Sequence, residues 1–291
     1  MTSTHDILAA EAAAGAERRV VWSGGGAPVS DGAGVQLNRI IGQPRLPDLD
    51  PFLLLDEFAS DDPGAYIAGF PSHPHRGFET VTYMLAGRMR HRDNAGNEGL
   101  LGPGSVQWMT AGRGIVHSEM PEQAEGRMQG FQLWVNLPAK DKLTAPRYQD
   151  IAAERVPIAS LGAGASARVL VGELAGVRGP VDPGATAPMF FDVSLAPGGL
   201  ARIATPAGHA AFVYVFEGEA SVGEPARTLA RGALGVLSAG EVTHLGSAAG
   251  GRLIFVAGRP LREPIAKAGP FVMNTEAELH QAFQDLRAGR F

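Results

Sequence analysis

The chain has 291 residues, enough for one large domain or two ordinary ones, and 45% of them are apolar, which suffices for buried cores. It contains no cysteine, so disulfides and thiolate metal sites are excluded, and a cytoplasmic location is expected. The net charge of −5 argues against direct binding to nucleic acid, and no apolar run is long enough to span a bilayer.

Glycine and proline are abundant, with 39 and 21 residues. This content is high for a helical protein and typical of many short strands joined by tight turns. Residues 1–18 are alanine-rich and lack the basic start of a signal peptide. We expect them to form an N-terminal extension, either a short helix or an irregular segment.

The first half of the chain predicts short strands in quick succession. Residues 18–22 suit a strand that ends at three glycines. Residues 35–41 alternate between apolar and polar, as a half-buried strand does, except for a slip at Arg39. Further strands are expected at 52–55, 80–85, 88–92, 106–109, 115–119 and 129–137. Strands at this spacing, without helical periodicity between them, indicate an antiparallel barrel or sandwich.

Two tripeptides on these strands carry metal-ligand side chains, His73-Pro74-His75 and His117-Ser118-Glu119. Side chains two apart on a strand point the same way, so each tripeptide directs two ligands at one point. Pro74 stiffens the first tripeptide and implies an edge, a bulge or the start of a strand. A single His-x-His pair is more often without a metal. Two pairs together predict that His73, His75, His117 and Glu119 bind one divalent transition metal.

The second half of the chain repeats the first weakly. Tyr83 to Gly87 (YMLAG) matches Tyr214 to Gly218 (YVFEG) at an offset of 131 residues, and Gly104 matches Gly232 at an offset of 128. Residues 139–150 between the halves suit a polar connector. The self-similarity predicts two copies of one β-domain.

The second copy is expected to lack the metal. By the same offsets, the four ligand positions fall on Ala204, Pro206, Leu245 and Ser247. His209 and His244 lie nearby but are not two residues apart. We therefore expect them to be packed or surface histidines.

The end of the chain predicts one amphipathic helix of about twelve residues. Thr275 and Glu278 form a capping-box pattern, Leu279, Ala282, Phe283 and Leu286 recur at helical spacing, and Gly289 suits the C-terminal stop. We expect the apolar stripe to be a packing face, in a position that spans both β-domains. A partner-binding helix is the alternative.

Several of these stretches resemble the pirin family of the cupin superfamily, whose members are bicupins. The resemblance covers most of the chain from about residue 20 and is carried by residues 50–58, 73–81, 107–119, 132–138 and 269–275. It implies an all-β fold of two tandem cupin domains (antiparallel β-barrels or jelly rolls) with a C-terminal α-helix. The expected division is an extension at 1–18, a metal-binding domain at 19–145, a metal-free domain at 146–260 and a helical segment at 261–291.

The resemblance also implies a function. The family's four metal ligands fall on His73, His75, His117 and Glu119, and iron is the expected metal, with copper, nickel, cobalt, manganese and zinc left open. Some members are similar in activity to quercetinase, which opens a flavonol ring with O₂ and releases carbon monoxide. Glu119 is then the expected catalytic residue, as acceptor of the hydroxyl proton, although a permanent ligand is equally compatible. The alternative is a non-catalytic metal-binding regulatory protein that acts through protein partners.

Three further residues are candidates for hydrogen bonds to the histidine ligands: His91, Asp93 and Glu79. Glu79 could alternatively lie on the strand surface, and His91 and Asp93 could be solvated near a hairpin end. Arg76 and Arg113 are expected to be loop anchors.

Overall fold

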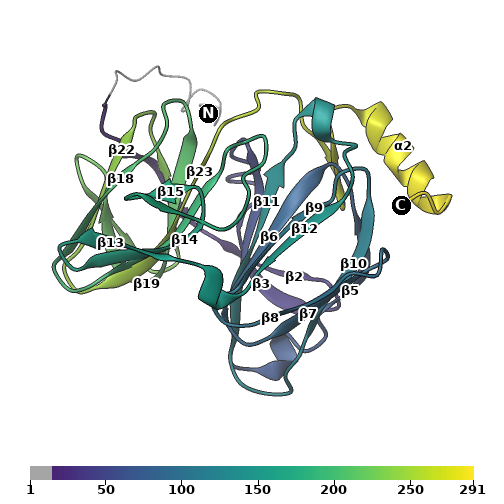
Figure 1. Ribbon diagram of the computed structural model, residues 1–291, viewed down its shortest axis with the longest axis horizontal. Helices are drawn as coiled ribbons and strands as arrows, with labels where there is room; N and C mark the ends of the chain where they lie inside the picture. The colour runs from purple at the N-terminus through teal and green to yellow at the C-terminus, as the bar shows by residue number, and fades with distance from the viewer. Residues whose placement is uncertain (1–14) are drawn as a thin grey trace. The chain divides into compact units, whose positions relative to one another are not determined.

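A computed structural model describes residues 15–291, and strands dominate them (Figure 1), as the sequence predicts. The chain divides into two compact units, each built from two segments. Unit 1 takes the N-terminal segment up to Gly26 together with Val156–Pro260, and unit 2 takes Ala27–Arg155 with Leu261–Phe291. The expected extension lies outside the described residues up to position 14, and the predicted domain boundaries stay predictions. Among the described residues, no helix has both the length and the hydropathy for a membrane span.

Unit 2 contains a seven-stranded antiparallel sheet of order β12-β9-β6-β11-β4-β3-β2. Its strands are β2 (Ala27–Asp31), β3 (Val35–Ile41), β4 (Phe52–Ser60), β6 (Phe78–Ala86), β9 (Val106–Thr110), β11 (Met128–Asn136) and β12 (Arg147–Ile151). A second sheet, of order β5-β10-β7-β8, consists of β5 (Phe70–His75), β7 (Met89–Asp93), β8 (Glu98–Leu101) and β10 (Ile115–Pro121). The 3₁₀ turns are η1 (Pro63–Ala65), η2 (Ala139–Asp141) and η3 (Ala153–Arg155).

Unit 1 repeats this arrangement. Its main strand order is β1-β21-β19-β23-β17-β14-β13. The long strand β19 also pairs with β20 and with β22, and β22 pairs in turn with β18. The strands are β1 (Val20–Gly25), β13 (Ile158–Gly162), β14 (Ala165–Val171), β17 (Met189–Leu195), β18 (Gly199–Ala204), β19 (Ala210–Val222), β20 (Arg227–Ala230), β21 (Ala233–Leu237), β22 (Val242–Ser247) and β23 (Gly251–Gly258). A short hairpin adds β15 (Glu173–Leu174) and β16 (Val177–Arg178). The strand orders of the two units correspond, with the long strand β19 in the places of both β6 and β7, which agrees with two copies of one β-domain.

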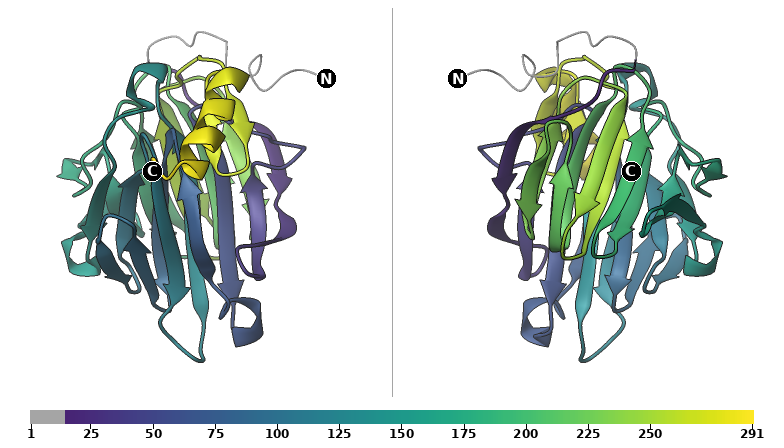
Figure 2. Two further views of the ribbon diagram at one scale, coloured as in Figure 1. Left: turned by 90° about the vertical axis from the view of Figure 1, so that its right-hand side faces the viewer. Right: turned by 90° about the vertical axis from the view of Figure 1, so that its left-hand side faces the viewer.

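The strand at one edge of the main sheet comes from the end of the sequence segment in unit 2 and from the N-terminal part of the chain in unit 1. In unit 2 this strand is β12, which pairs with β9 and overlaps the end of the stretch at 139–150 that the sequence analysis treated as a connector. That interpretation was wrong because an edge strand with one solvated face is polar. In unit 1 the same place is taken by β1, which pairs with β21 (Figure 2, right, purple beside green).

Strand pairing corrects the correspondence between the two copies. His73 lies opposite His117 in unit 2, and Ala201 lies opposite Leu245 in unit 1. The counterpart of His73 is therefore Ala201, and not Ala204 as the 131-residue offset suggested. The connection from β18 to β19 is longer than the one from β5 to β6, and this difference changes the offset between the two strands.

The interiors of the two units differ in polarity. Unit 1 is filled by a large apolar cluster that includes Ala201, Ile203 and Leu245. In unit 2, the buried residues of β5 and β10 include His75, His117 and Glu119. The polar interior of unit 2 is therefore where a functional site is expected.

The C-terminal segment completes unit 2. It forms the hairpin of β24 (Ala266–Ala268) and β25 (Phe271–Met273), followed by helix α2 (Glu276–Arg287), yellow in Figure 2. Thr275 and Glu278 form the predicted capping box. Leu279 and Ala282 on the helix pack with Phe271 and other residues of the hairpin. The apolar stripe is thus a packing face, and the residues of this cluster all belong to unit 2 rather than to both units.

Candidate metal centre

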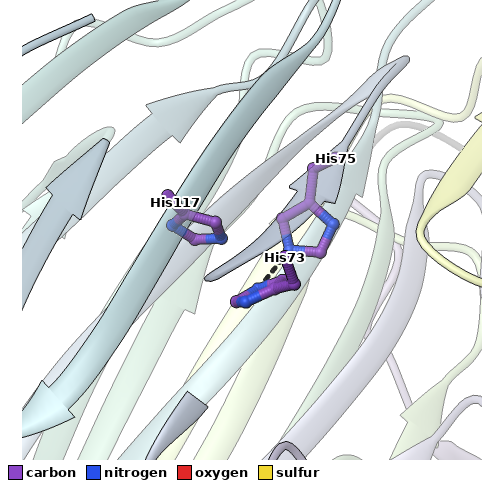
Figure 3. A group of neighbouring side chains, drawn as sticks. All are labelled: His73, His75 and His117. Carbon is purple, nitrogen blue, oxygen red and sulfur yellow. Dashed lines mark hydrogen bonds between the residues drawn. The ribbon is translucent and has the colours of Figure 1, made fainter. Parts of the chain in front are cut away.

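Three histidines from neighbouring strands lie together in unit 2. His73 and His75 come from β5, and His117 comes from β10, directly opposite His73 in the antiparallel pairing. The nitrogen atoms that they offer all lie within 4.8 Å of one another. Figure 3 shows the three rings grouped around one point, with a dashed line between His73 and His75. The predicted strand positions of both tripeptides are confirmed.

Backbone carbonyls set the orientation of the two histidines on β5. Nδ1 of His73 lies 2.8 Å from the Pro71 carbonyl oxygen, and Nδ1 of His75 lies 3.4 Å from that of Pro270. A carbonyl only accepts, so both Nδ1 atoms carry the proton and donate it. Each Nε2 atom then presents a lone pair, and the two Nε2 atoms are 3.1 Å apart. Two lone pairs at this distance repel each other unless a cation lies between them.

The third histidine is buried. Nε2 of His117 has no hydrogen-bond partner among the described residues, and its Nδ1 lies 3.4 Å from Nδ1 of His91. Burial, together with the neighbouring histidines, lowers the pKa of His117 well below its usual value. Burial and the nearby His73 lower the pKa of His75 to about 3. Both rings are therefore neutral at pH 7, which is the form that binds metal.

The residues present thus fit a bound metal ion. An unpartnered buried nitrogen is rare in folded proteins, and the neutral imidazoles on β5 and β10 direct their Nε2 atoms to a common point. Nitrogen donors of this kind suit iron, copper, nickel, cobalt and zinc.

Glu119, the fourth expected ligand, is held by hydrogen bonds instead of being grouped with the histidines. Its oxygens lie 3.1 Å from the hydroxyl of Thr82 and 3.1 Å from the amide nitrogen of Gln132. Glu119 is buried, and the pairing of β10 with β5 shifts register between His117 and Glu119. Its role as a metal ligand stays a prediction.

The three candidates for hydrogen bonds to the histidines have different surroundings. His91 is buried against His117, with ring centroids 5.0 Å apart. Asp93 instead accepts hydrogen bonds from Ala95 and Asn97 in its own turn. Glu79 is buried, and the hydroxyl of Thr110 donates to its carboxylate at 2.7 Å. Asp93 lies opposite His117 in the pairing of β7 with β10, and among these three residues it is the side chain of His91 that contacts the His117 ring.

A loop anchor holds the tripeptide of β5 in place. The guanidinium of Arg76 donates to the Arg113 carbonyl oxygen at 2.6 Å and to the Asp285 carboxylate at 2.7 Å. The next residue, Gly77, has a φ of +87°, and a side-chain carbon there would lie 2.0 Å from the Val272 carbonyl oxygen. The connection from β5 to β6 therefore requires glycine where β25 approaches it.

The cluster opens into a cavity of about 610 Å³ in unit 2. Its lining is mostly apolar, with Phe70, Trp134 and Met89 among the walls, and both His73 and His75 face it. The volume lies within the range of roughly 300–1,000 Å³ that is typical of small-molecule sites. The site can therefore hold an aromatic molecule beside the histidines.

Sequence reasoning assigned no role to Thr82, Gln132, Trp134 or Pro270. Gln132 and Trp134 are two apart on β11, and this spacing on a strand near the tripeptides was the available signal. Pro270 lies 195 residues from His75 in the sequence, and no local pattern indicates that its carbonyl accepts a hydrogen bond from the imidazole.

Comparison with known proteins agrees with this description. Residues 34–135 match the Pirin family, and residues 190–291 match the Pirin C-terminal cupin domain. The fold and the site therefore define a bicupin, with two cupin domains and a histidine cluster in one of them. The chain belongs to the pirin family.

Three similar proteins cover nearly the whole chain. A Pseudomonas aeruginosa protein named "Putative quercetin 2,3-dioxygenase" is 52% identical over 91% of this chain and 94% of its own length. Human pirin is 40% identical over 94% of this chain and 93% of its own. The crystal structure of a quercetin 2,3-dioxygenase from Acinetobacter baumannii has a TM-score of 0.88 and 34% identity, and it covers 95% of this chain and 99% of that one.

Proposed function

We propose that this protein is a metal-dependent dioxygenase that opens the ring of a flavonol such as quercetin with O₂. The observation that carries the proposal is the histidine cluster at the wall of a cavity large enough for an aromatic substrate. The relatives named as quercetin 2,3-dioxygenases support it, because they match nearly the full length of the chain. A cytoplasmic location is part of the same proposal.

The proposed metal ligands are His73, His75, His117 and Glu119, with Fe²⁺ as the first candidate metal and copper, nickel, cobalt, manganese and zinc as the others. With three neutral imidazoles and one carboxylate as ligands, a divalent ion would keep a residual charge of +1 and would supply a Lewis acid for an anionic oxygen. A deprotonated flavonol hydroxyl provides such an oxygen.

The residues of the chain position the substrate and receive its proton. In the proposal, Glu119 accepts the hydroxyl proton as the flavonol binds. Thr82 and Gln132 hold the carboxylate from the side of β6 and β11, so it stays directed into the interior. The apolar walls of the cavity exclude water from the aromatic rings.

Turnover tests the activity directly. The protein is loaded anaerobically with one metal at a time and mixed with excess quercetin and O₂. The expected result is loss of the flavonol absorbance over many turnovers with at least one metal, together with release of carbon monoxide. No turnover with iron, copper, nickel, cobalt or manganese contradicts the dioxygenase and leaves the alternative of a regulatory metal-binding protein.

Elemental analysis tests the ligands independently of activity. His73→Ala and His117→Ala are expected to lose most of the bound metal, whereas His280→Ala, at an exposed position on α2, retains it. Full metal retention in both ligand variants would refute the assignment.

A further inference from the structure

Lys267, an exposed residue, lies on the wall of the same cavity as His73 and His75. It belongs to β24, just before the segment whose Pro270 carbonyl orients His75. The hairpin that supports the metal centre therefore also brings a cation into the cavity.

The ammonium of Lys267 has spare hydrogen-bonding capacity. It carries three N–H donors. Among the described residues its hydrogen-bond acceptor is the Leu53 carbonyl oxygen, at 3.3 Å. Desolvation and repulsion by Arg39 lower the pKa of Lys267, although Asp48 and Asp56 act in the opposite direction. An anion at this place would raise the pKa of Lys267 again and use the remaining donors.

The other cation of this wall, Arg39, is already paired. Its guanidinium forms two hydrogen bonds to Asp56, at 3.0 and 2.7 Å, and one to Asp31 at 2.9 Å. Arg39 thus has two carboxylate partners, whereas Lys267 forms no ion pair within residues 15–291. An incoming anion would therefore be bound by Lys267 rather than by Arg39.

Trp134 lies near both Lys267 and the histidine cluster. Its ring centroid lies 5.5 Å from Nζ of Lys267 and 5.2 Å from the ring of His75. A planar aromatic molecule that packs against Trp134 would therefore come near both the histidines and the ammonium. The rings contact an aromatic surface, and the two ends meet groups of different chemistry.

We propose that Lys267 is a specificity-determining residue whose ammonium binds an anionic oxygen at the end of an aromatic substrate remote from the histidine cluster. The proposal rests on the proposed function in taking flavonols as the substrate class. It goes further by selecting, within that class, molecules that carry a sulfate, a carboxylate or an ionised phenol at the remote end.

Binding without O₂ tests this separately from turnover. Zinc-loaded protein is titrated calorimetrically with quercetin 7-sulfate and with 7-O-methylquercetin, which carry an anionic and a neutral group at the same oxygen. The variants are Lys267→Met, which retains the stem against Trp134, Lys267→Arg, which retains the charge, and Lys140→Met, an exposed control outside the cavity.

The wild type is expected to bind the sulfate more tightly. Lys267→Met should weaken binding of the sulfate about tenfold and leave the methyl ether nearly unchanged, since one charged hydrogen bond is lost. Lys267→Arg should retain most of the preference, and Lys140→Met all of it. The proposal is overturned if Lys267→Met affects both ligands equally or affects neither. It is also overturned if the wild type binds neither ligand.

Turnover distinguishes this failure from failure of the proposed function. A charge preference without turnover overturns the dioxygenase and keeps the role of Lys267. Turnover of quercetin without any charge preference keeps the dioxygenase and overturns the role of Lys267.

Discussion

Each imidazole of the cluster presents Nε2 because a specific neighbour faces its Nδ1. For His73 and His75 these neighbours are backbone carbonyls, and for His117 the neighbour is the side chain of His91. A backbone carbonyl cannot be removed by substitution, but His91 can. His91 is therefore the residue through which the orientation of a ligand can be tested.

His91→Ala should weaken metal binding by a factor of about 10 to 100, because loss of such a hydrogen-bond partner leaves the ligand imidazole free to rotate. Competition with a chromophoric chelator measures the metal Kd. The exposed His280→Ala serves as the matched control. An unchanged Kd in a folded His91→Ala protein would show that His91 does not orient His117.

His209 in unit 1 is also buried, with a different consequence. Burial, followed by the charges of Arg18 and Arg259, lowers the pKa of His209 to about 4. The unfolded chain therefore binds a proton at this residue more readily than the folded one between pH 6.5 and 4. Stability is lost as the pH falls through this window, by at most about 3 kcal/mol from this group.

His209→Gln should accordingly reduce the acid sensitivity of unit 1. Urea unfolding at pH 7 and pH 4 measures the change in the free energy of unfolding between the two conditions. We expect this change to be smaller in the variant than in the wild type. The same change in both proteins would mean that His209 binds its proton equally well in the folded and unfolded states.

At the scale of elements, the C-terminal hairpin supports the end of β5 by hydrogen bonds and packing. Val272 donates to the Arg76 carbonyl oxygen, Arg76 donates to that of Pro270, and Phe271 and Val272 are fully buried. Lys142, in the connection after β11, links the same hairpin to the segment that follows β5. Its ammonium donates to the carbonyl oxygens of Gly77 and Val272 and to the side-chain oxygen of Asn136, at 2.8–3.0 Å.

Lys142→Met should lower the free energy of unfolding of unit 2 by about 3 kcal/mol, because it leaves three buried acceptors without a donor. Burial lowers the pKa of Lys142 to about 8, so its ammonium is still mostly protonated at neutral pH. Lys140→Met, two residues away and exposed, is the control and should change stability little. Denaturant unfolding compares the two, and equal stability would contradict the role assigned to Lys142.

At the scale of the molecule, each unit is built from two segments that are far apart in the sequence. The strand β1 precedes unit 2 in sequence and belongs to unit 1, whereas residues 261–291 follow unit 1 and belong to unit 2. Each unit therefore depends on a segment that is remote from it in the sequence.

Deletion of residues 261–291 should destabilise unit 2, although unit 1 precedes the deleted segment directly. The deletion uncovers Leu53 and Phe78, which pack with Val272, and removes the acceptor of His75. Hydrogen exchange should show loss of protection in β5 and β6, with β19 and β23 still protected. Loss of protection confined to unit 1 would contradict this assignment of the segment.

The sequence determined the features that depend on local periodicity. The two-residue repeat predicted the strands that carry both tripeptides, the slip at Arg39 coincides with a shift of register in β3, and the capping box marked the start of α2. The three histidines of the cluster were identified in advance for the same reason, since a strand places alternate side chains on one face.

Only the tertiary structure decided what comes from pairings between distant parts of the chain. These pairings make the polar residues 147–151 a strand, align Ala201 rather than Ala204 with His73, and bring Pro270 and Lys267 to the cavity of the histidines. The physical reason is that strand order and register are set by hydrogen bonds and packing across the sheets, and such contacts leave no periodic signal in the local sequence.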